Sequence, residues 1–202
     1  MPLSKEHKRQ THERIVRAAS RVFRAEGVHG VGIADLMKQA GLTHGGFYAH
    51  FPSKDALVAE SCAQGMTESS EQLFAQADAA PPDERLRAII RGYLSRSHRD
   101  TPDTGCVIAA LATDVAREPL PVRSAFTQAL TQYARRLARY IPRRPDEATA
   151  HPDEPDERAL LLLSGMVGAL LMARAVDDPN LSDHILLAAR RFYMRAYAED
   201  AV

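Results

Sequence analysis

The side chains with the clearest potential for chemistry lie in one short stretch, Thr43-His44-Gly45-Gly46-Phe47-Tyr48. Two adjacent glycines inside a helix cost about 1 kcal/mol each relative to alanine. Gly45 and Gly46 therefore indicate that the backbone here comes close to another molecule. His44 and Tyr48 are four residues apart and share one helical face, opposite the apolar side that carries Phe47. This pattern suits a contact with DNA.

The elements around this stretch have the dimensions of a helix-turn-helix unit. A longer amphipathic helix has its apolar stripe from Ile15 to Phe23 and is predicted to end at Gly27, a residue that suits a left-handed C-cap. A very short helix over 33–40 ends at Gly41, and a third helix begins at Thr43, a residue type favoured at a helix N-cap. In such units the second helix of the pair enters the major groove by its N-terminal end.

The charge of the chain is divided unevenly. Its 202 residues hold 26 basic and 26 acidic side chains, and this neutral total would argue against a nucleic-acid partner. Residues 1–56, however, hold nine basic and five acidic groups, a net +4, whereas 57–202 hold 17 basic and 21 acidic groups, a net −4. A basic N-terminal module followed by an acidic domain with a different partner is the expected organisation.

The rest of the chain also predicts helices. Strand signals are weak, and apolar residues recur at spacings of three and four, so we expect an all-α fold of about nine helices. Beyond a fourth helix capped by Ser53, the predicted helices cover 86–93, 107–115, 122–141, 159–173 and 181–196. Residues 142–157, rich in proline and acidic side chains, are expected to form a mobile surface loop.

Several classes of protein are excluded or disfavoured by composition. The near-average composition argues against a disordered chain, a collagen-like fibre or a disulfide-stapled module. The first residues lack the pattern of a secretory signal, and the longest uncharged run, Ala159 to Ala173, is shorter than the roughly 20 residues of a membrane span. We therefore expect a cytoplasmic protein in which Cys62 and Cys106 remain thiols.

The N-terminal residues resemble the signature of the TetR family of transcriptional repressors. The resemblance extends over residues 14–57 and rests on the following positions: Arg14-Ile15, Ala18-Ala19, Phe23, Gly27, Leu36, Ala40-Gly41-Leu42-Thr43, Gly45, Phe47-Tyr48-Ala49-His50-Phe51 and Ser53-Lys54-Asp55-Ala56-Leu57. It implies a DNA-binding domain over 1–56, with three helices in its helix-turn-helix, and an effector-binding, dimerising domain over 57–202. The implied protein is a homodimeric repressor that binds a palindromic operator and is released by a small-molecule effector.

The same resemblance assigns roles to individual residues. Thr43, His44 and Gly45 match positions that meet bases and backbone, whereas Tyr48 and Lys54 match positions that commonly hold phosphates. Lys54 also lies in the first turn of the fourth helix, where backbone N–H groups and an ammonium can share one phosphate. The chain departs from the family at Val31-Gly32, where Thr or Ser usually begins the second helix, so a hydroxyl cap is lost although glycine is itself an acceptable N-cap.

Small residues in the apolar helix predict an interface between two copies of the chain. Ser164 and Gly168 are four residues apart, as are Gly165 and Ala169, and this spacing lets helices approach closely. The predicted interface consists of Ser164, Gly165, Gly168, Leu171, Ile185 and Phe192. The alternative is a helix buried in the core of a single chain.

Cys106 is the remaining candidate for chemistry. It precedes a predicted helix, whose dipole can stabilise a thiolate, so it is a candidate electrophile or redox sensor, or else a small buried side chain. His98, Asp100 and Asp103 lie near one another in sequence but complete no metal site. We predict no metal and no cofactor, and a helical enzyme that uses Cys106 or His98 is a remote alternative.

Overall fold

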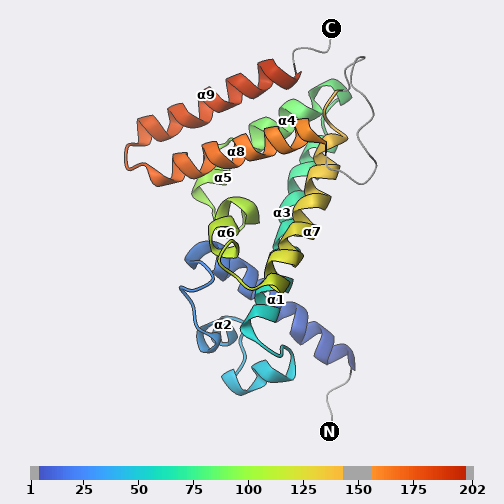
Figure 1. Ribbon diagram of the computed structural model, residues 1–202, viewed down its shortest axis with the longest axis vertical. Helices are drawn as coiled ribbons and strands as arrows, with labels where there is room; N and C mark the ends of the chain where they lie inside the picture. Colours follow the sequence, from blue (N-terminus) through green and yellow to red (C-terminus); the bar gives the residue numbers. More distant parts are fainter. Residues whose placement is uncertain (1–4, 143–155, 199–202) are drawn as a thin grey trace. The chain divides into compact units, whose positions relative to one another are not determined.

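The computed structural model describes residues 5–142 and 156–198, and in these ranges it confirms the all-α prediction (Figure 1). The α-helices are α1 (Lys5–Glu26), α2 (Ile33–Gln39), α3 (Lys54–Asp78), α4 (Arg85–Tyr93), α5 (Arg96–Asp100), α6 (Val107–Val115), α7 (Leu120–Ala138), α8 (Glu157–Ala175) and α9 (Pro179–Ala198). Two 3₁₀ helices, η1 (His44–Ala49) and η2 (Pro82–Glu84), complete the described elements.

The contacts divide the chain into two compact units. The first contains the described residues up to Ser69 together with Pro102–Ala129, and the second contains Ser70–Thr101 and the described residues from Leu130 onward. Helices α3 and α7 each contribute to both units. The functional boundary predicted between residues 56 and 57 falls inside α3 and stays a prediction.

The first unit is built on the apolar faces of α1 and α2, as the sequence predicts. Ile15 and Phe23 are fully buried, and Gly27 ends α1 in the left-handed region with φ of 79°. Gly41 follows α2 with φ of 69°, a conformation that glycine adopts without strain. Gly32 takes the N-cap position of α2 and, as expected, no side-chain hydroxyl caps this helix.

The segment after α2 differs from the predicted α-helix. Residues 44–49 form a 3₁₀ helix, and the hydroxyl of Thr43 accepts no capping hydrogen bond although Thr43 occupies the N-cap position. The physical reason is local, because the two glycines weaken α-helical winding and a 3₁₀ turn is a common short alternative. The Ser53 cap is confirmed, since its Oγ accepts a hydrogen bond of 3.2 Å from the amide of Ala56.

In the second unit α8 and α9 run antiparallel and pack side by side (Figure 1). One side of α8 is buried through Leu162, Met166 and Leu170. By length and composition α8 could cross a membrane, but the core helix of a soluble protein passes the same test. Most of the loop expected over 142–157 lies outside the described residues.

Candidate nucleic-acid interface

The predicted contact residues of the helix-turn-helix share an exposed segment. Thr43, His44 and Gly45 are exposed at the start of η1, and the side chain of Tyr48 is 65% exposed. The Tyr48 ring rests edge-on against Phe47, with 5.2 Å between ring centroids. Phe47 is fully buried, so it fixes η1, which carries the exposed residues, to the core. We call Thr43, His44, Gly45 and Tyr48 the reading segment.

The reading segment is fixed to α2 and to the core beneath it. The amide of Leu42 donates to the carbonyl of Met37 at 2.8 Å, which closes the turn between α2 and η1. A Cβ built on Gly46 would lie 3.7 Å from Met37 Cε, whereas one on Gly45 would meet no described atom within 4 Å. Gly46 therefore faces its own chain, and Gly45 faces open space. Packing within the chain therefore does not require a glycine at position 45.

A group of imidazole and aromatic rings supports the end of η1. The His12 ring stacks on Phe51 at 4.3 Å, and its Nε2 lies 2.6 Å from a carboxylate oxygen of Glu60. His50 packs beside Phe51 with 6.5 Å between ring centroids. Burial lowers the pKa of His50, and the neighbouring His12 and Lys8 lower it further. His12 was not identified from the sequence, because its partners are distant along the chain.

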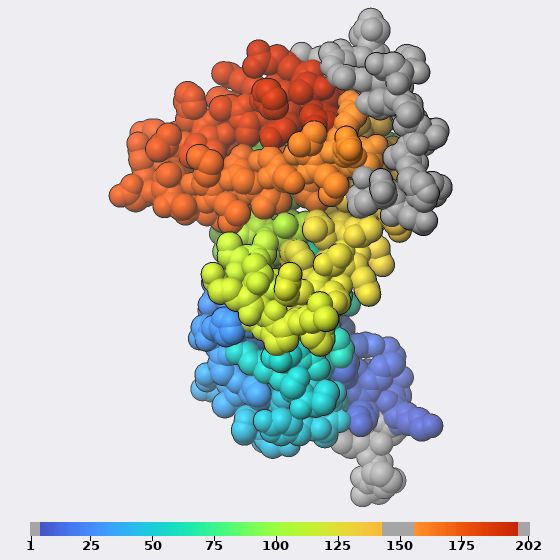
Figure 2. Space-filling view, in the orientation of Figure 1, coloured from blue at the N-terminus to red at the C-terminus, as the bar shows by residue number. Residues whose placement is uncertain are grey.

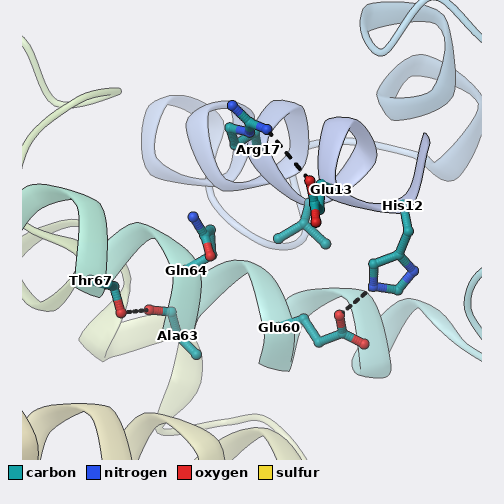
Figure 3. A pocket seen from close by; sticks show the side chains of 8 residues that line it. His12, Glu13, Arg17, Glu60, Ala63, Gln64 and Thr67 are labelled. Atoms are coloured by element: carbon teal, nitrogen blue, oxygen red, sulfur yellow. Dashed lines mark hydrogen bonds and ion pairs between the residues drawn. The ribbon is translucent and has the colours of Figure 1, made fainter. Parts of the chain in front are cut away.

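A polar groove runs between α1 and α3 beside this cluster (Figure 3). It has a volume of about 490 Å³ and is lined by His12, Glu13, Val16, Arg17, Glu60, Ala63, Gln64 and Thr67. Within it, the Arg17 guanidinium lies 4.0 Å from Glu13. Two pairs of lining side chains, Arg17 with Glu13 and His12 with Glu60, already contact one another, so we assign no ligand to this groove.

The structure places Lys54 differently from the other predicted contacts. Its ammonium donates to the carbonyl of Val28 at 2.7 Å and to that of Val31 at 2.8 Å. The ammonium also lies 5.9 Å from the centre of the Phe23 ring. Lys54 is half-buried, whereas the reading segment is exposed. The phosphate contact expected of Lys54 therefore has to compete with two bonds inside the protein.

The basic side chains of α1 are mostly exposed, and one is internal. The exposed cations are Lys5, Lys8, Arg9, Arg14, Arg17 and Arg21. Arg24 is instead buried, and it donates to the carbonyls of Ser20 at 3.1 Å and of Gly105 at 2.9 Å. Burial lowers the pKa of Arg24. Its charge consequently serves the junction of α1 with the start of α6 rather than attraction to DNA.

The predicted dimer residues lie on two adjacent helices. Phe192 of α9 is 57% exposed, and two residues of α8 outside the predicted set, Leu161 and Met172, are 65% and 60% exposed. Leu171 is also exposed and Ile185 is half-buried. Figure 2 shows that α8 and α9 both reach the surface of the molecule on the same side. Helix α8 is therefore not a helix buried all round in the core of a single chain.

The small residues of α8 have separate roles. A Cβ on Gly165 would overlap the hydroxyl of Tyr193 in α9, so this glycine permits a contact within the chain rather than with a partner. A Cβ on Gly168 would meet no described atom within 4 Å. The hydroxyl of Ser164 donates to the carbonyl of Leu160 in its own helix at 2.7 Å. Gly168 is the small residue that leaves open space on the outer face.

The two cysteines are buried and are not joined in a disulfide. Burial raises the pKa of Cys62 to about 12, which keeps this thiol protonated. Cys106 takes the N-cap position of α6 and interacts electrostatically with Arg24. Both thiols interact electrostatically with Arg24, but of the two only Cys106 also lies at the N-cap of a helix, where the helix dipole is positive.

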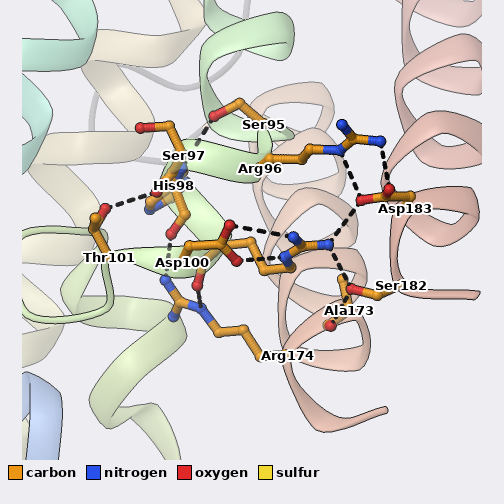
Figure 4. Close-up of polar contacts among 11 residues, drawn as sticks. Ser95, Arg96, Ser97, His98, Asp100, Thr101, Ala173, Arg174, Ser182 and Asp183 are labelled. Atoms are coloured by element: carbon orange, nitrogen blue, oxygen red, sulfur yellow. Dashed lines mark hydrogen bonds and ion pairs between the residues drawn. The ribbon is translucent and has the colours of Figure 1, made fainter. Parts of the chain in front are cut away.

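Of the three residues weighed for a metal, His98 and Asp100 are occupied by other contacts (Figure 4). His98 Nδ1 lies 2.7 Å from the carbonyl of Tyr93, and Asp100 binds Arg99 at 2.7 Å. Arg99 also bonds Asp183 of α9 at 2.8 Å, and Arg174 of α8 donates to the carbonyl of His98 at 2.7 Å. These side chains attach α5 to the α8–α9 pair. In the described parts of the chain, no group of three potential ligands could hold a metal ion.

Comparisons with known proteins agree with the geometry. A family model described as "Bacterial regulatory proteins, tetR family" matches residues 15–61, and one described as "Tetracyclin repressor-like, C-terminal domain" matches residues 82–189. The HTH-type transcriptional regulator LmrA of Bacillus subtilis is 29% identical over 127 residues, which cover 61% of this chain and 67% of that protein. The HTH-type transcriptional regulator YxaF of the same organism is 22% identical over 170 residues, 83% of this chain and 87% of that protein.

Solved structures show the same fold. The reduced form of E. coli NemR superposes with a TM-score of 0.71 at 21% sequence identity and covers 96% of this chain and 100% of that one. A TetR transcriptional regulator from Chloroflexus aurantiacus gives a TM-score of 0.66 at 22% identity, over 94% of this chain and 97% of that one. At these identities the likeness concerns the fold.

Proposed function

The chain belongs to the TetR family of bacterial transcriptional regulators, which are DNA-binding and non-enzymatic, and from this premise we propose that it is a homodimeric repressor released from a palindromic operator by a small-molecule effector. The observation that carries the proposal is the exposed reading segment anchored on a fully buried Phe47. We assign DNA reading to residues 1–56, and effector binding and dimerisation to 57–202. Such a protein acts in the cytoplasm, where the chromosome lies.

The chemistry of the reading segment supports a division of labour on the duplex. Thr43 and His44 carry polar groups that can hydrogen-bond base edges or phosphates, and Gly45 lets the backbone approach closely. The side chain of Tyr48 is exposed in the same segment, and its hydroxyl suits a phosphate oxygen. Phosphate contacts set the register of the protein, and base contacts select the sequence.

The exposed faces of α8 and α9 support a twofold dimer. Leu161, Leu171, Met172 and Phe192 are large apolar side chains that water surrounds in the single chain. Several exposed large apolar side chains on two adjacent helices favour an interaction site, and a second copy of the same surface covers them in an isologous dimer. Two reading segments related by such an axis, about 34 Å apart, read a palindrome with half-sites one turn of DNA apart.

Release follows if the effector binds one state of the dimer more tightly than the other. An effector with higher affinity for a state whose reading segments are wrongly spaced lowers operator affinity by that difference in binding free energy. Coupling free energies of about 1–3 kcal/mol are typical, which correspond to a 5- to 150-fold change in affinity. The operator lowers effector affinity by the same factor.

The test starts from a randomised duplex library, since the protein can select its own operator. Selected duplexes should share an inverted repeat, and binding should weaken steeply with salt. His44→Ala should weaken binding to the selected duplex, whereas His7→Ala, at an exposed position on α1 outside the reading segment, provides a control for the loss of an imidazole. Equal affinity for selected and random duplexes would contradict the proposal.

A second candidate is a repressor that senses electrophiles through Cys106. The favouring observation is the position of this thiol at the N-cap of α6, beside the Arg24 guanidinium. Modification of a 4% exposed side chain would force the start of α6 to move. Cys106→Ser should abolish release of DNA by N-ethylmaleimide, and Cys62→Ser should leave it intact. Release from the Cys106→Ser protein at the wild-type rate would exclude the thiol mechanism.

A further inference from the structure

The loop of residues 27–32 determines where α2 and the reading segment begin. Gly27 has a positive φ, and a Cβ on Gly30 would overlap the carbonyl of Glu26. Val28 and Val31 anchor the loop in the core, with 2% and 5% of their surfaces exposed. The loop is joined directly to α2, because the Leu36 amide donates a hydrogen bond of 3.1 Å to the carbonyl of Gly32, the last residue of the loop. A change in the position of the loop should therefore also shift the start of α2.

The loop is held on one side by Lys54 from the first turn of α3. An ammonium has three N–H donors, and Lys54 directs two of them to the carbonyls of Val28 and Val31 at 2.7 and 2.8 Å. Hydrogen bonds from a charged donor are about twice as strong as neutral ones. Moving this ammonium to a phosphate would leave two partly buried carbonyls without their donor, which is costly.

The other side of the loop is held by the C-terminal part of α6. A carboxylate oxygen of Asp114 accepts a 2.8 Å hydrogen bond from the amide of Val28. Two residues beyond α6's C-cap, Glu118 is buried and lies 2.9 Å from the ring of His29 in the same loop. Val28 thus donates its amide to an anion and offers its carbonyl to a cation, so both of its backbone polar groups are held by charged side chains.

We propose that Lys54 and Asp114 are positioning residues that clamp Val28 from two sides, and that Lys54 serves this clamp instead of a DNA phosphate. The clamp makes the position of the reading segment depend on α6, because Asp114 is part of that helix. The inference rests on the proposed binding of DNA by this chain. It does not depend on the operator sequence, on the effector or on the dimer. Its tests therefore use none of these three.

The first test measures backbone amide exchange in the full chain without DNA. In Lys54→Met, which keeps the length of the side chain, the Val28 and Leu36 amides should exchange about fivefold faster or more, because one ordinary hydrogen bond is worth about that factor. Asp114→Ala should accelerate the Leu36 amide similarly. Lys38→Met, at an exposed cation on α2, is the matched control and should leave both rates unchanged.

The second test measures binding of a random-sequence 30-base-pair duplex against salt concentration. Each phosphate neutralised by a lysine contributes about 0.9 to the slope of log affinity against log salt. The proposal expects the same slope for Lys54→Met as for the wild type. A slope lower by about 0.9 for each bound copy of the chain would assign Lys54 to a phosphate and overturn the proposal. Unchanged exchange of the Val28 and Leu36 amides in Lys54→Met would overturn it as well.

Discussion

Replacing Gly45 by alanine separates the stability of the protein from its ability to approach DNA. In the structure the added Cβ meets no described atom within 4 Å, and the φ of Gly45 is not positive. Alanine therefore fits the backbone, and its better helix propensity should change the free energy of unfolding by no more than about 1 kcal/mol, in the stabilising direction. Urea denaturation measures this part of the prediction.

The affinity for DNA should respond in the opposite sense. A methyl group forced into a close contact costs about 1–3 kcal/mol, which corresponds to a 5- to 150-fold increase in Kd at 1.4 kcal/mol per tenfold. Fluorescence anisotropy with the selected operator duplex measures it. Gly46→Ala is the control, because its Cβ would lie 3.7 Å from Met37 inside the same chain. Wild-type affinity in Gly45→Ala, or an equal loss in Gly46→Ala, would refute the reasoning.

Three further outcomes follow from the packing and charge of the fold. The methyl group added in Gly65→Ala would overlap Ser20 Oγ and approach Val107 Cγ2 to 2.9 Å. Urea denaturation should therefore show a free energy of unfolding lower by about 1–3 kcal/mol. An unchanged value would mean that α1, α3 and α6 move apart at little cost. Phe192→Glu should convert the dimer to a folded monomer in sedimentation velocity, with unchanged circular dichroism, and a persistent dimer would contradict the proposed interface. Burial lowers the pKa of His98, so the unfolded chain binds its proton more readily, and its contribution to stability is complete above about pH 6.5 and is lost on acidification. Between pH 7.5 and 5.5 the wild type should therefore lose stability faster than His98→Asn, by at most about 1.4 kcal/mol per pH unit, and equal slopes would refute this role.

The helices with a continuous apolar stripe and a glycine, serine or proline at their ends could be predicted from the sequence. Gly27 and Gly41 end their helices where predicted, and α6 has the predicted bounds. Helix α5 could not be predicted, because its residues Arg96–Asp100 carry no apolar periodicity. Its supports are a cap from Ser95 and polar contacts to residues more than 70 positions away, such as those of Arg174.

The exposed placement of the reading segment could be predicted because its signals are local, and its role in reading DNA stays a prediction. Adjacent glycines, a buried phenylalanine and outward polar side chains can be recognised within six residues. The partners of Lys54 and Gly165 could not be identified, since they depend on which segments the fold brings near. The sequence places a cation in the first turn of α3, but only the structure shows that two carbonyls of the 27–32 loop accept hydrogen bonds from it. Similarly, the space over Gly165 is filled by Tyr193 of the same chain.

Hydroxyl-radical footprinting of the selected operator tests most directly whether this chain reads DNA as a dimer through its reading segment. The account predicts two symmetric protected patches with centres roughly 10 base pairs apart. Both patches should weaken together in Gly45→Ala, because the two copies carry the same change, and both should persist in Gly46→Ala. A single asymmetric patch, or protection that is indifferent to Gly45→Ala, would contradict it.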